Sequence, residues 1–426
     1  MIAVLQSNMT TKFYYNRKKL YFFSVAIEKS IFSQKFFMVK RDLSEILKKD
    51  LHKDKALILL GARQVGKTTL LQNLSKAWEH TLWLTGDELE TQRLFESPTV
   101  TRFKAEFAGV KYLIIDEAQR LPNVGLGLKL ITDHLKNIQL LVTGSSAFEL
   151  SNRLHESLMG RTFEYQLFPL SFSEMADFHT LREEKRLLPY RLVYGYYPNV
   201  VMCPEDNKKI LQNLVQNFLY KDMLLLEDVK KPDKIVKLLQ ALAFQIGSQV
   251  SYNEISKIVG LNVATVEKYI ILLEQSFVIF RLSSFSRNLR SELSKSRKIY
   301  FYDNGIRNAM IDNLSSMETR TDVGALWENF LISERMKSLK NNERWCNRYF
   351  WRTKEQQEID YIEEEDGKLR AFEFKWSSHT KAKITKTFTN VYPQAETQII
   401  TPENYVDFVI NQRKEQTMIQ SNNFKK

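Results

Sequence analysis

The sequence is poor in the residues that mark fibrous, disulfide-bonded or membrane-embedded chains. Of its 426 residues, 2 are cysteine, 14 are glycine and 9 are proline. So little cysteine excludes a disulfide scaffold or a cysteine-rich zinc site, and it predicts a cytoplasmic location. Collagen-like and low-complexity repeats are excluded because glycine and proline are scarce. No apolar run approaches the roughly 18 residues that a membrane helix needs, so we expect no membrane partner.

What remains is an ordinary globular composition, with 43% hydrophobic and 26% charged residues. At roughly 100–200 residues per domain, the length predicts two to four domains. The net charge is +12, but residues 1–40 contribute +6 and the last sixteen residues contribute +3. The basic excess therefore lies mostly at two ends that resemble solvated tails, and it is weak evidence for binding to nucleic acid.

Short apolar runs alternate with helical patterns in the first half of the chain. The runs expected to be strands are Ala56–Leu60, Thr81–Leu84, Tyr112–Ile115 and Gln139–Val142. Nearly continuous apolar strands separated by helices indicate a parallel sheet that is buried on both faces. The pattern predicts an α/β fold of the nucleotide-binding kind.

A phosphate-binding motif follows the first of these strands. Residues 61–68 fit G-x-x-x-x-G-K-[ST], and a helical pattern follows them. In this motif glycines permit a tight loop whose N–H groups face phosphates, and the positive helix N-terminus adds to the attraction. We expect Lys67 to reach the β and γ phosphates, and the Thr68 hydroxyl to bind Mg²⁺. The predicted nucleotide-binding residues here are Gly61, Ala62, Arg63, Gln64, Val65, Gly66, Lys67, Thr68 and Thr69.

Three further polar positions complete the predicted ATP site. Asp116 and Glu117 end an apolar strand, so Asp116 is expected to hold Mg²⁺ and Glu117 to orient the attacking water. Ser145, with Thr143 as the second choice, is expected to sense the γ-phosphate. Arg161 is predicted to act as an arginine finger or sensor, because charge on the transferred phosphoryl group needs a cation. ATP is favoured over GTP because no N-K-x-D sequence is present.

The motifs taken together resemble those of a known family. The segments that carry the resemblance are Gly61–Thr69, Leu113–Gln119, Thr143–Ser146, Gly160–Arg161, Phe168–Glu174, Gly195–Pro198, Asp303–Ile306 and Gly324–Phe330. They are similar to those of prokaryotic AAA-type P-loop ATPases that carry a C-terminal domain of unknown function like the PD-(D/E)xK nucleases. The resemblance covers roughly residues 38–402 and implies ATP binding and hydrolysis.

The middle region predicts a winged helix-turn-helix, because three helical patterns and a hairpin follow one another. The helices are expected at Ile235–Ile246, Tyr252–Val259 and Val263–Ser276, and a strand at Phe277–Leu282. The exposed side of the third helix is expected to include Asn262, Thr265, Glu267 and Lys268. Only one of these residues is basic. Cations gather in the expected wing, with Phe285 among them: Arg281, Arg287, Arg290, Lys295, Arg297 and Lys298. The sequence leaves open whether this region binds DNA or docks a protein partner.

The C-terminal region contains a D-x(n)-E-x-K pattern. Asp360 precedes a hairpin turn at Asp366-Gly367, and Glu373 and Lys375 follow it on one face of a strand. Two carboxylates held together there could bind Mg²⁺, with Lys375 steadying developing charge. The resemblance adds Glu328 as a third ligand on the preceding helix. The alternative is a solvated hairpin with ion pairs on one face.

The predicted architecture is an α/β chain with an AAA-type P-loop core, a winged helix and an α/β nuclease-like domain. The expected parts are an N-terminal extension (1–37), the ATPase domain (38–180), a helical linker region (181–231), the winged helix (232–310), the nuclease-like domain (320–402) and a tail (403–426). We expect an ATPase that uses ATP and Mg²⁺ and couples them to rearrangement of its C-terminal half, with DNA as one partner. The alternatives are an ATP-regulated DNA nuclease and a nucleotide-dependent switch for protein partners. The sequence leaves the oligomeric state open.

Overall fold

The computed structural model describes residues 38–144, 158–217, 232–285, 297–377 and 384–410. The predicted extension (1–37) and Ser145 lie outside the described residues, as do the last sixteen positions. The chain divides into two units after Lys40, and the helices and strands of the described ranges belong to the second unit. Within the described ranges, no helix is both long enough and apolar enough to cross a membrane.

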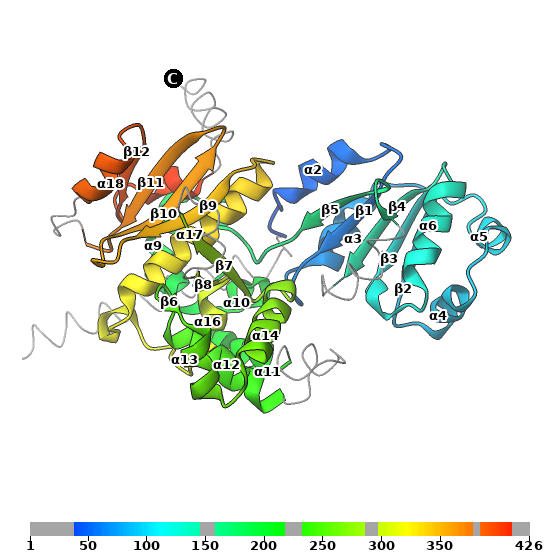
Figure 1. The fold of residues 1–426 in the computed structure, drawn as a ribbon. Helices are drawn as coiled ribbons and strands as arrows, with labels where there is room; N and C mark the ends of the chain where they lie inside the picture. The colour runs from blue at the N-terminus through cyan, green and yellow to red at the C-terminus, as the bar shows by residue number, and fades with distance from the viewer. Residues whose placement is uncertain (1–37, 145–157, 218–231, 286–296, 378–383, 411–426) are drawn as a thin grey trace, which may run out of the picture. The chain divides into compact units, whose positions relative to one another are not determined.

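The first sheet has five parallel strands in the order β2-β3-β4-β1-β5 (Figure 1). The strands are β1 (Ala56–Leu60), β2 (Thr81–Thr85), β3 (Tyr112–Asp116), β4 (Gln139–Gly144) and β5 (Thr162–Gln166). Each of the five residues of β1 is buried, as expected for a central parallel strand. The predicted α/β class with a buried parallel sheet is confirmed, although β5 was not foreseen.

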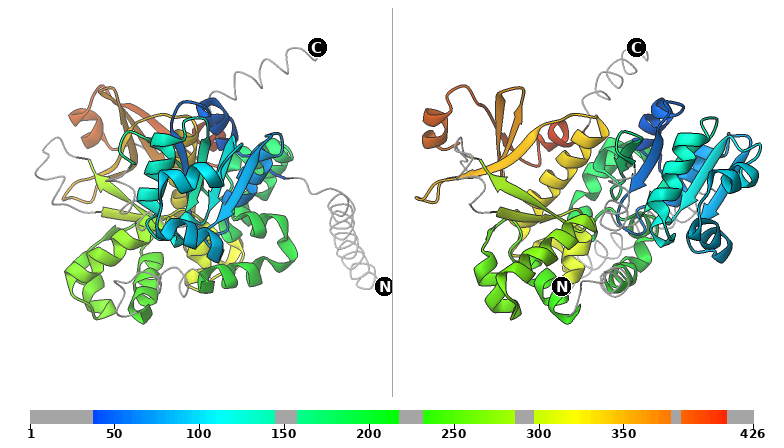
Figure 2. Two further views of the ribbon diagram at one scale, coloured as in Figure 1. Left: turned by 90° about the vertical axis from the view of Figure 1, so that its right-hand side faces the viewer. Right: turned by 45° about the vertical axis from the view of Figure 1, so that its right-hand side comes forward.

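Helices cover this sheet, and those that follow β2 and β3 share one apolar core with it (Figures 1 and 2). The helices are α2 (Leu43–Asp50), α3 (Lys67–Ser75), α4 (Leu89–Glu96), α5 (Val100–Glu106) and α6 (Val124–His134). Ile58 of β1 and Ile115 of β3 pack in the same cluster as Phe95, Phe103 and Leu128. The alternation along β1 sends Leu57 and Leu59 to the other face.

Four α-helices follow β5 in the described residues up to Asn217. They are α8 (Phe172–Phe178), α9 (Leu181–Tyr194), α10 (Pro198–Met202) and α11 (Asn207–Asn217). A capping box begins α8: Ser171 accepts from the backbone N–H of Glu174, whose carboxylate accepts from the N–H of Ser171. Gly195 ends α9 and Pro198 begins α10, which are the helix positions that glycine and proline favour.

The middle region contains α12 (Pro232–Phe244), β6 (Gln249–Val250), α13 (Tyr252–Val259), α14 (Val263–Gln275), β7 (Ile279–Ser284) and β8 (Arg297–Phe301). Ser251 caps α13, and Gly260 ends it in the left-handed conformation. Asn262 caps α14. β7 pairs antiparallel with β8, which pairs antiparallel with β6. The described part of this region therefore contains three helices and three short strands.

A single seven-stranded sheet joins the middle and C-terminal regions, in the order β12-β11-β10-β9-β7-β8-β6. Its further strands are β9 (Asn347–Arg352), β10 (Glu358–Glu365), β11 (Lys368–Phe374) and β12 (Glu396–Ile400). The connection is parallel pairing of β7 with β9. The two regions expected to be separate domains thus share a sheet (Figure 1).

The remaining helices of the described chain are α16 (Asn304–Met310), α17 (Val323–Asn341), α18 (Lys386–Val391) and α19 (Tyr405–Val409). α17 is buried along most of its length, including Trp327, Leu331 and Met336. The folded chain continues past residue 402 into the expected tail, because Tyr405 and Phe408 of α19 are buried against aromatic neighbours.

Candidate functional site

The phosphate-binding loop lies between β1 and α3, at the carboxyl end of the sheet strands. Gly66 has φ of 97°, a left-handed conformation that favours glycine. A Cβ on Gly61 would lie 2.3 Å from the carbonyl oxygen of Leu167, so only glycine fits beside that backbone. The Lys67 ammonium donates to the carbonyl oxygens of Gly61 (2.9 Å) and Ala62 (3.0 Å). The loop therefore folds around its own lysine at the N-terminus of α3.

Gly61→Ala is expected to destabilise the fold by about 1–3 kcal/mol and to weaken ATP binding, because the new methyl group must displace the backbone at Leu167. Gly324→Ala is a matched control, since its Cβ would meet nothing within 4 Å and alanine favours a helix. Urea denaturation and equilibrium ATP binding measure both effects. Equal stability of the two variants would contradict the steric account.

Thr68, Asp116 and Thr143 form a connected polar group beside the loop. The Thr68 hydroxyl donates to Oδ2 of Asp116 at 2.8 Å, and the Thr143 hydroxyl donates to Oδ1 of the same carboxylate. Thr143, the second choice in the sequence-based prediction, is fully buried at the end of β4. The structure therefore joins β4 to the acidic strand through Thr143, whereas Ser145 lies outside the described residues.

Glu117 stands at the edge of this group with a constrained backbone. Its φ is 51°, and its N–H donates to the Thr143 hydroxyl at 3.1 Å. Gln119 donates from Nε2 to Oε2 of Glu117 at 2.5 Å, which fixes one side of the carboxylate. Glu117 is half-buried, and the role predicted for it requires that its carboxylate accept a hydrogen bond from water.

Arg161 does not reach the phosphate loop of its own chain, so its predicted role there is corrected. It precedes β5, and its neighbour Thr162 is level with Ala56 at the start of β1. The loop follows the other end of β1, roughly 16 Å away at about 3.3 Å per strand residue. Arg161 instead donates from Nε to Asp133 of α6 at 2.6 Å. That bond raises the pKa of Arg161 and lowers the pKa of Asp133.

Arg41 is a contact of the loop that sequence reasoning missed. It is buried, and one terminal nitrogen donates to the carbonyl oxygen of Val65 in the loop at 2.8 Å. The other donates to the carbonyl oxygen of Phe168 at 2.6 Å, while Nε donates to Glu174 at 3.0 Å. A single arginine in a basic segment gives no sequence signal for such a position.

The segment that Arg41 contacts is also bonded to α17. The N–H of Phe172 donates to Oε2 of Glu334 at 2.7 Å, and Lys337 donates to the carbonyl oxygen of Leu170 at 3.0 Å. Glu334 and Lys337 also pair with each other at 2.7 Å and are almost completely buried. A continuous set of hydrogen bonds thus runs from the phosphate loop to α17.

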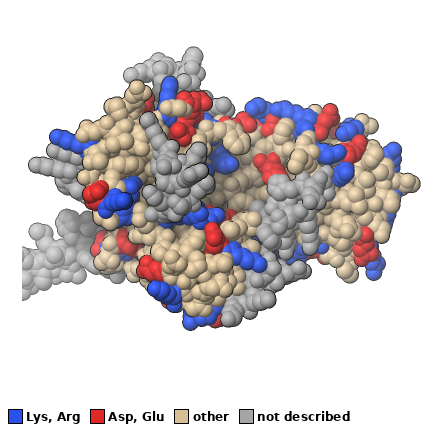
Figure 3. All heavy atoms as spheres, viewed as in Figure 1, with Lys and Arg blue, Asp and Glu red and all other residues tan. Residues whose placement is uncertain are grey.

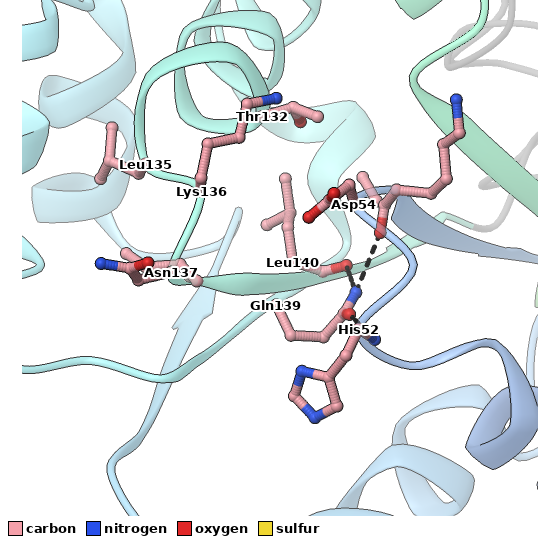
Figure 4. A pocket seen from close by; sticks show the side chains of 11 residues that line it. His52, Asp54, Thr132, Leu135, Lys136, Asn137, Gln139 and Leu140 are labelled. Atoms are coloured by element: carbon pink, nitrogen blue, oxygen red, sulfur yellow. Dashed lines mark hydrogen bonds between the residues drawn. The ribbon is translucent and has the colours of Figure 1, made fainter.

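A hollow at the opposite edge of the first sheet is a different feature from the phosphate site (Figure 4). It is lined by the amino ends of β1 and β4 and by the end of α6. Gln139 spans it, accepting from the N–H of His52 at 2.6 Å and donating to the carbonyl oxygen of Lys55 at 3.0 Å. Gln139 of β4 thus links this strand to the segment that precedes β1. The hollow lies at the amino end of these strands, away from the glycine loop.

The structure brings the predicted acidic residues of the C-terminal region together. β10 and β11 pair with Tyr361 opposite Phe372, and one further step along this register places Asp360 opposite Glu373. Oδ2 of Asp360 accepts from the N–H of Phe374 at 2.8 Å, and Lys375 donates to Oε1 of Glu373 at 2.7 Å. Glu328 approaches from α17 and is mostly buried.

Three residues that were not predicted for this site, Lys298, Tyr300 and Glu358, belong to the same cluster. Lys298 of β8 contacts Oε1 of Glu328 at 3.0 Å and also contacts Glu358. The Tyr300 hydroxyl donates to Oε1 of Glu328 at 2.6 Å. We call the acidic cluster the group Lys298, Tyr300, Glu328, Glu358, Asp360, Glu373 and Lys375.

Burial dominates the electrostatics of the acidic cluster. Burial, together with the charges of Glu328 and Glu373, raises the pKa of Asp360 well above its ordinary value. Burial alone would lower the pKa of Lys298, but Glu328, Glu358 and Asp360 outweigh it and raise the pKa. The cluster is therefore an enclosed charge network and not the solvated hairpin that was the alternative.

A divalent cation does not fit these residues as they stand. The ammonium of Lys298 already lies against two of the carboxylates, and in the described part of the chain no three acidic, histidine or cysteine side chains are grouped to hold a metal. One oxygen of Glu373, Oε2, is buried without a hydrogen-bond partner. While the Lys298 ammonium is in contact with Glu328 and Glu358, a divalent ion would have to displace it to reach those carboxylates.

Three of the six cations of the expected DNA-contacting wing make contacts within the fold. Arg281 pairs with Glu274 at 2.5 Å, and Arg297 contacts Glu267 at 3.3 Å and lies over the ring of Tyr252. Phe285, expected between exposed cations, is instead buried in an aromatic cluster, and Lys298 is buried as described above. Three other predicted cations, Arg287, Arg290 and Lys295, lie outside the described residues. On the face drawn in Figure 3, basic and acidic residues are interspersed.

Comparison with known proteins supports the ATPase part of the chain. Residues 53–176 match a family model described as an AAA domain. Residues 185–317 match a domain of unknown function (DUF8612), and residues 323–424 match another (DUF4143). The first match shows that residues 53–176 are similar to an AAA domain, and the glycine loop described above lies within this range. The other two matches assign no activity.

Relatives of similar length have no described activity. An uncharacterized protein of Mycobacterium tuberculosis (strain H37Rv) is 27% identical over 344 residues, which is 80% of this chain and 74% of the relative. An uncharacterized protein of Methanocaldococcus jannaschii is 24% identical over 368 residues, which is 81% of this chain and 79% of the relative. Among solved structures, a Walker-type ATPase of Pyrococcus abyssi gives a TM-score of 0.47 at 16% identity, covering 65% of this chain and 97% of that one.

Proposed function

We propose that this protein is a Mg²⁺-dependent ATPase. The observation that carries the proposal is the joined arrangement of the glycine loop, Lys67, Thr68 and Asp116 at the carboxyl end of a parallel sheet. Open α/β sheets bind ligands at this end of their strands. The match of residues 53–176 to an AAA domain supports the same activity.

Each residue of the site has a distinct task in this proposal. The N–H groups of the loop and the start of α3 bind the phosphates, and the Lys67 ammonium offsets their charge. Glu117 accepts a hydrogen bond from the attacking water and receives its proton, while Gln119 holds the carboxylate in place. Thr143 orients both Asp116 and the backbone of Glu117.

Thr68 and Asp116 are the residues that would hold Mg²⁺. Their hydroxyl and carboxylate oxygens are hard donors, and they lie in direct contact beside the loop. When bound, Mg²⁺ neutralises charge on the phosphates. The geometry of these two side chains therefore fits the metal that the proposed activity uses.

We further propose that nucleotide binding is communicated to α17. The loop carbonyl of Val65 is held by Arg41, Arg41 pairs with Glu174, and the same segment is bonded to Glu334 and Lys337 of α17. In this proposal, movement of the loop around the phosphates changes the hydrogen bond between Arg41 and the Val65 carbonyl. The buried hydrogen bonds that follow have few alternative arrangements, so the change reaches α17.

Arg41→Met is expected to lower the free energy of unfolding by about 3–5 kcal/mol, because it leaves the Glu174 carboxylate buried without its cation. It is also expected to remove the ATP-induced change in hydrogen exchange of α17. Denaturation and hydrogen-exchange mass spectrometry, each with and without ATP, measure the two effects.

The control for this variant is Arg186→Met, which breaks an exposed pair with Glu183 and should cost at most about 1 kcal/mol. The double variant Arg41→Met/Glu174→Gln should recover part of the lost stability, because no buried charge is left unpaired. If ATP does not change the rate of hydrogen exchange of α17 in the wild type, the proposed communication is contradicted.

A second candidate function is a nucleotide-dependent switch for a protein partner. The engaged state of the described wing cations favours it over direct contact with DNA. The test is steady-state ATP hydrolysis with and without double-stranded DNA. Hydrolysis that DNA leaves unchanged supports the protein switch, stimulation by DNA supports the DNA-acting ATPase, and no hydrolysis in either arm contradicts the proposed activity.

A further inference from the structure

The acidic cluster is enclosed on several sides by the fold itself. The Glu328 carboxylate receives the Tyr300 hydroxyl and the Lys298 ammonium at Oε1. At its other oxygen it approaches the backbone of Gly247, where an added Cβ would lie 3.2 Å away. Both oxygens of the Glu328 carboxylate therefore lie close to groups of the fold.

We propose that Lys298 is the resident cation of the acidic cluster, and that its ammonium takes the place of a divalent metal among Glu328, Glu358 and Asp360. The side chain is 1% exposed and lies over the ring of Phe350, with 5.5 Å between Nζ and the ring centroid. A permanently attached ammonium needs no binding from solution. The C-terminal region is therefore a charge-neutralised scaffold and not a metal-dependent nuclease.

The strand register and helix contacts hold Lys298 in this position. Lys298 and Tyr300 are two residues apart on β8, so both point to the side on which Glu328 lies. The next residue of α17, Asn329, accepts from the N–H of Phe301 at 2.8 Å and donates to its carbonyl oxygen at 3.0 Å. This clamp fixes β8 against α17 and keeps the lysine beside the buried carboxylates.

The balance of charges in the cluster agrees with the assignment. Four carboxylates, those of Glu328, Glu358, Asp360 and Glu373, are accompanied by three cations: Lys298, Lys375 and Arg352. A divalent ion added to these cations would reverse the sign of the group. The Lys298 ammonium lies against two of these carboxylates, so a divalent ion would meet a like charge at the position that it needs.

The first arm of the test uses the full-length wild type and needs no folding assumption. Binding of Mn²⁺ is measured by calorimetry without nucleotide, in the wild type and in Asp360→Asn. Manganese bound elsewhere, including at the ATP site, is common to both proteins. The proposal predicts identical isotherms. Mn²⁺ binding in the wild type that Asp360→Asn removes would overturn it.

The second arm removes the ammonium. Lys298→Met is expected to gain one Asp360-dependent Mn²⁺ per chain that the wild type does not bind, because a like charge has left the site. The gain should be lost again in Lys298→Met/Asp360→Asn. Lys337→Met is the matched control, since it also breaks a buried lysine–glutamate pair but should gain no Mn²⁺.

Circular dichroism establishes whether each variant is folded. If Lys298→Met does not fold, Lys298→Met/Glu328→Gln replaces it, because this pair removes one positive and one negative charge together. That protein retains Glu358, Asp360 and Glu373 and should bind Mn²⁺ in an Asp360-dependent manner. A folded variant that gains no Mn²⁺ would overturn the proposal. None of these outcomes depends on ATP hydrolysis, so the inference stands or falls separately from the proposed ATPase activity.

Discussion

Lys67→Ala is expected to weaken ATP binding by about 100-fold or more and to abolish ATP turnover. The buried ammonium is the cation inside the phosphate loop, and charge-assisted bonds to phosphate are among the strongest polar contacts in proteins. Removing it leaves the phosphate charge uncompensated in a site from which water is partly excluded. Equilibrium binding of a fluorescent ATP analogue measures the loss.

The matched control for this variant is Lys76→Ala. Lys76 follows α3 and is exposed, at the far end of the helix from the phosphate loop. Its removal changes the net charge of the domain by the same amount, so equal losses in the two variants would show a non-specific electrostatic effect. Unchanged ATP affinity in Lys67→Ala would contradict the assignment of the loop as the nucleotide site.

Glu117→Gln is expected to retain ATP binding and to lower kcat by about 10²–10⁴-fold. The amide keeps the shape of the carboxylate but cannot take a proton from water. The contact with Gln119 remains possible after the amide is flipped, so the local fold should be preserved. Steady-state hydrolysis and equilibrium binding, measured on the same preparation, separate the two effects.

Glu79→Gln serves as the control, because this exposed glutamate lies between α3 and β2, away from the loop. It should leave both kcat and ATP affinity unchanged. Normal hydrolysis in Glu117→Gln would show that Glu117 is not the residue that accepts the proton of the attacking water. Another base at the carboxyl end of the sheet would then have to do so.

The nucleotide-binding half was predictable because its signals are local. The run Ala56–Leu60 begins and ends at the residues that form β1, and the motif after it fixes a loop geometry that depends on few other residues. Likewise Ser251 and Gly260 mark the ends of α13 through cap chemistry that acts within one turn. Such features require no knowledge of the tertiary fold.

Contacts between distant segments were not predictable from the same signals. Arg41 binds Glu174 across 133 positions of sequence, and nothing near either residue indicates the partner. Thr143 was ranked below Ser145, although its position at the strand end places its hydroxyl on Asp116. Both contacts depend on tertiary packing, which the local sequence pattern does not describe.

Lys298 was predicted to be an exposed wing residue, but it is buried. The segment from Arg281 to Lys298 was interpreted as a basic wing because cations are usually exposed. In the fold, β8 is an inner strand of the seven-stranded sheet, and its alternation directs Lys298 toward acids from α17 and β10. Only the sheet order, which joins the middle and C-terminal regions, reveals this environment.

The most direct test of the ATPase assignment is analysis of the nucleotide that remains bound after full-length protein is incubated with ATP and Mg²⁺ and rapidly separated from free ligand. The wild type should carry ADP, Glu117→Gln should carry intact ATP, and Lys67→Ala should carry neither. ATP that stays intact on the wild type, or equal ADP on the wild type and Glu117→Gln, would contradict the proposed mechanism.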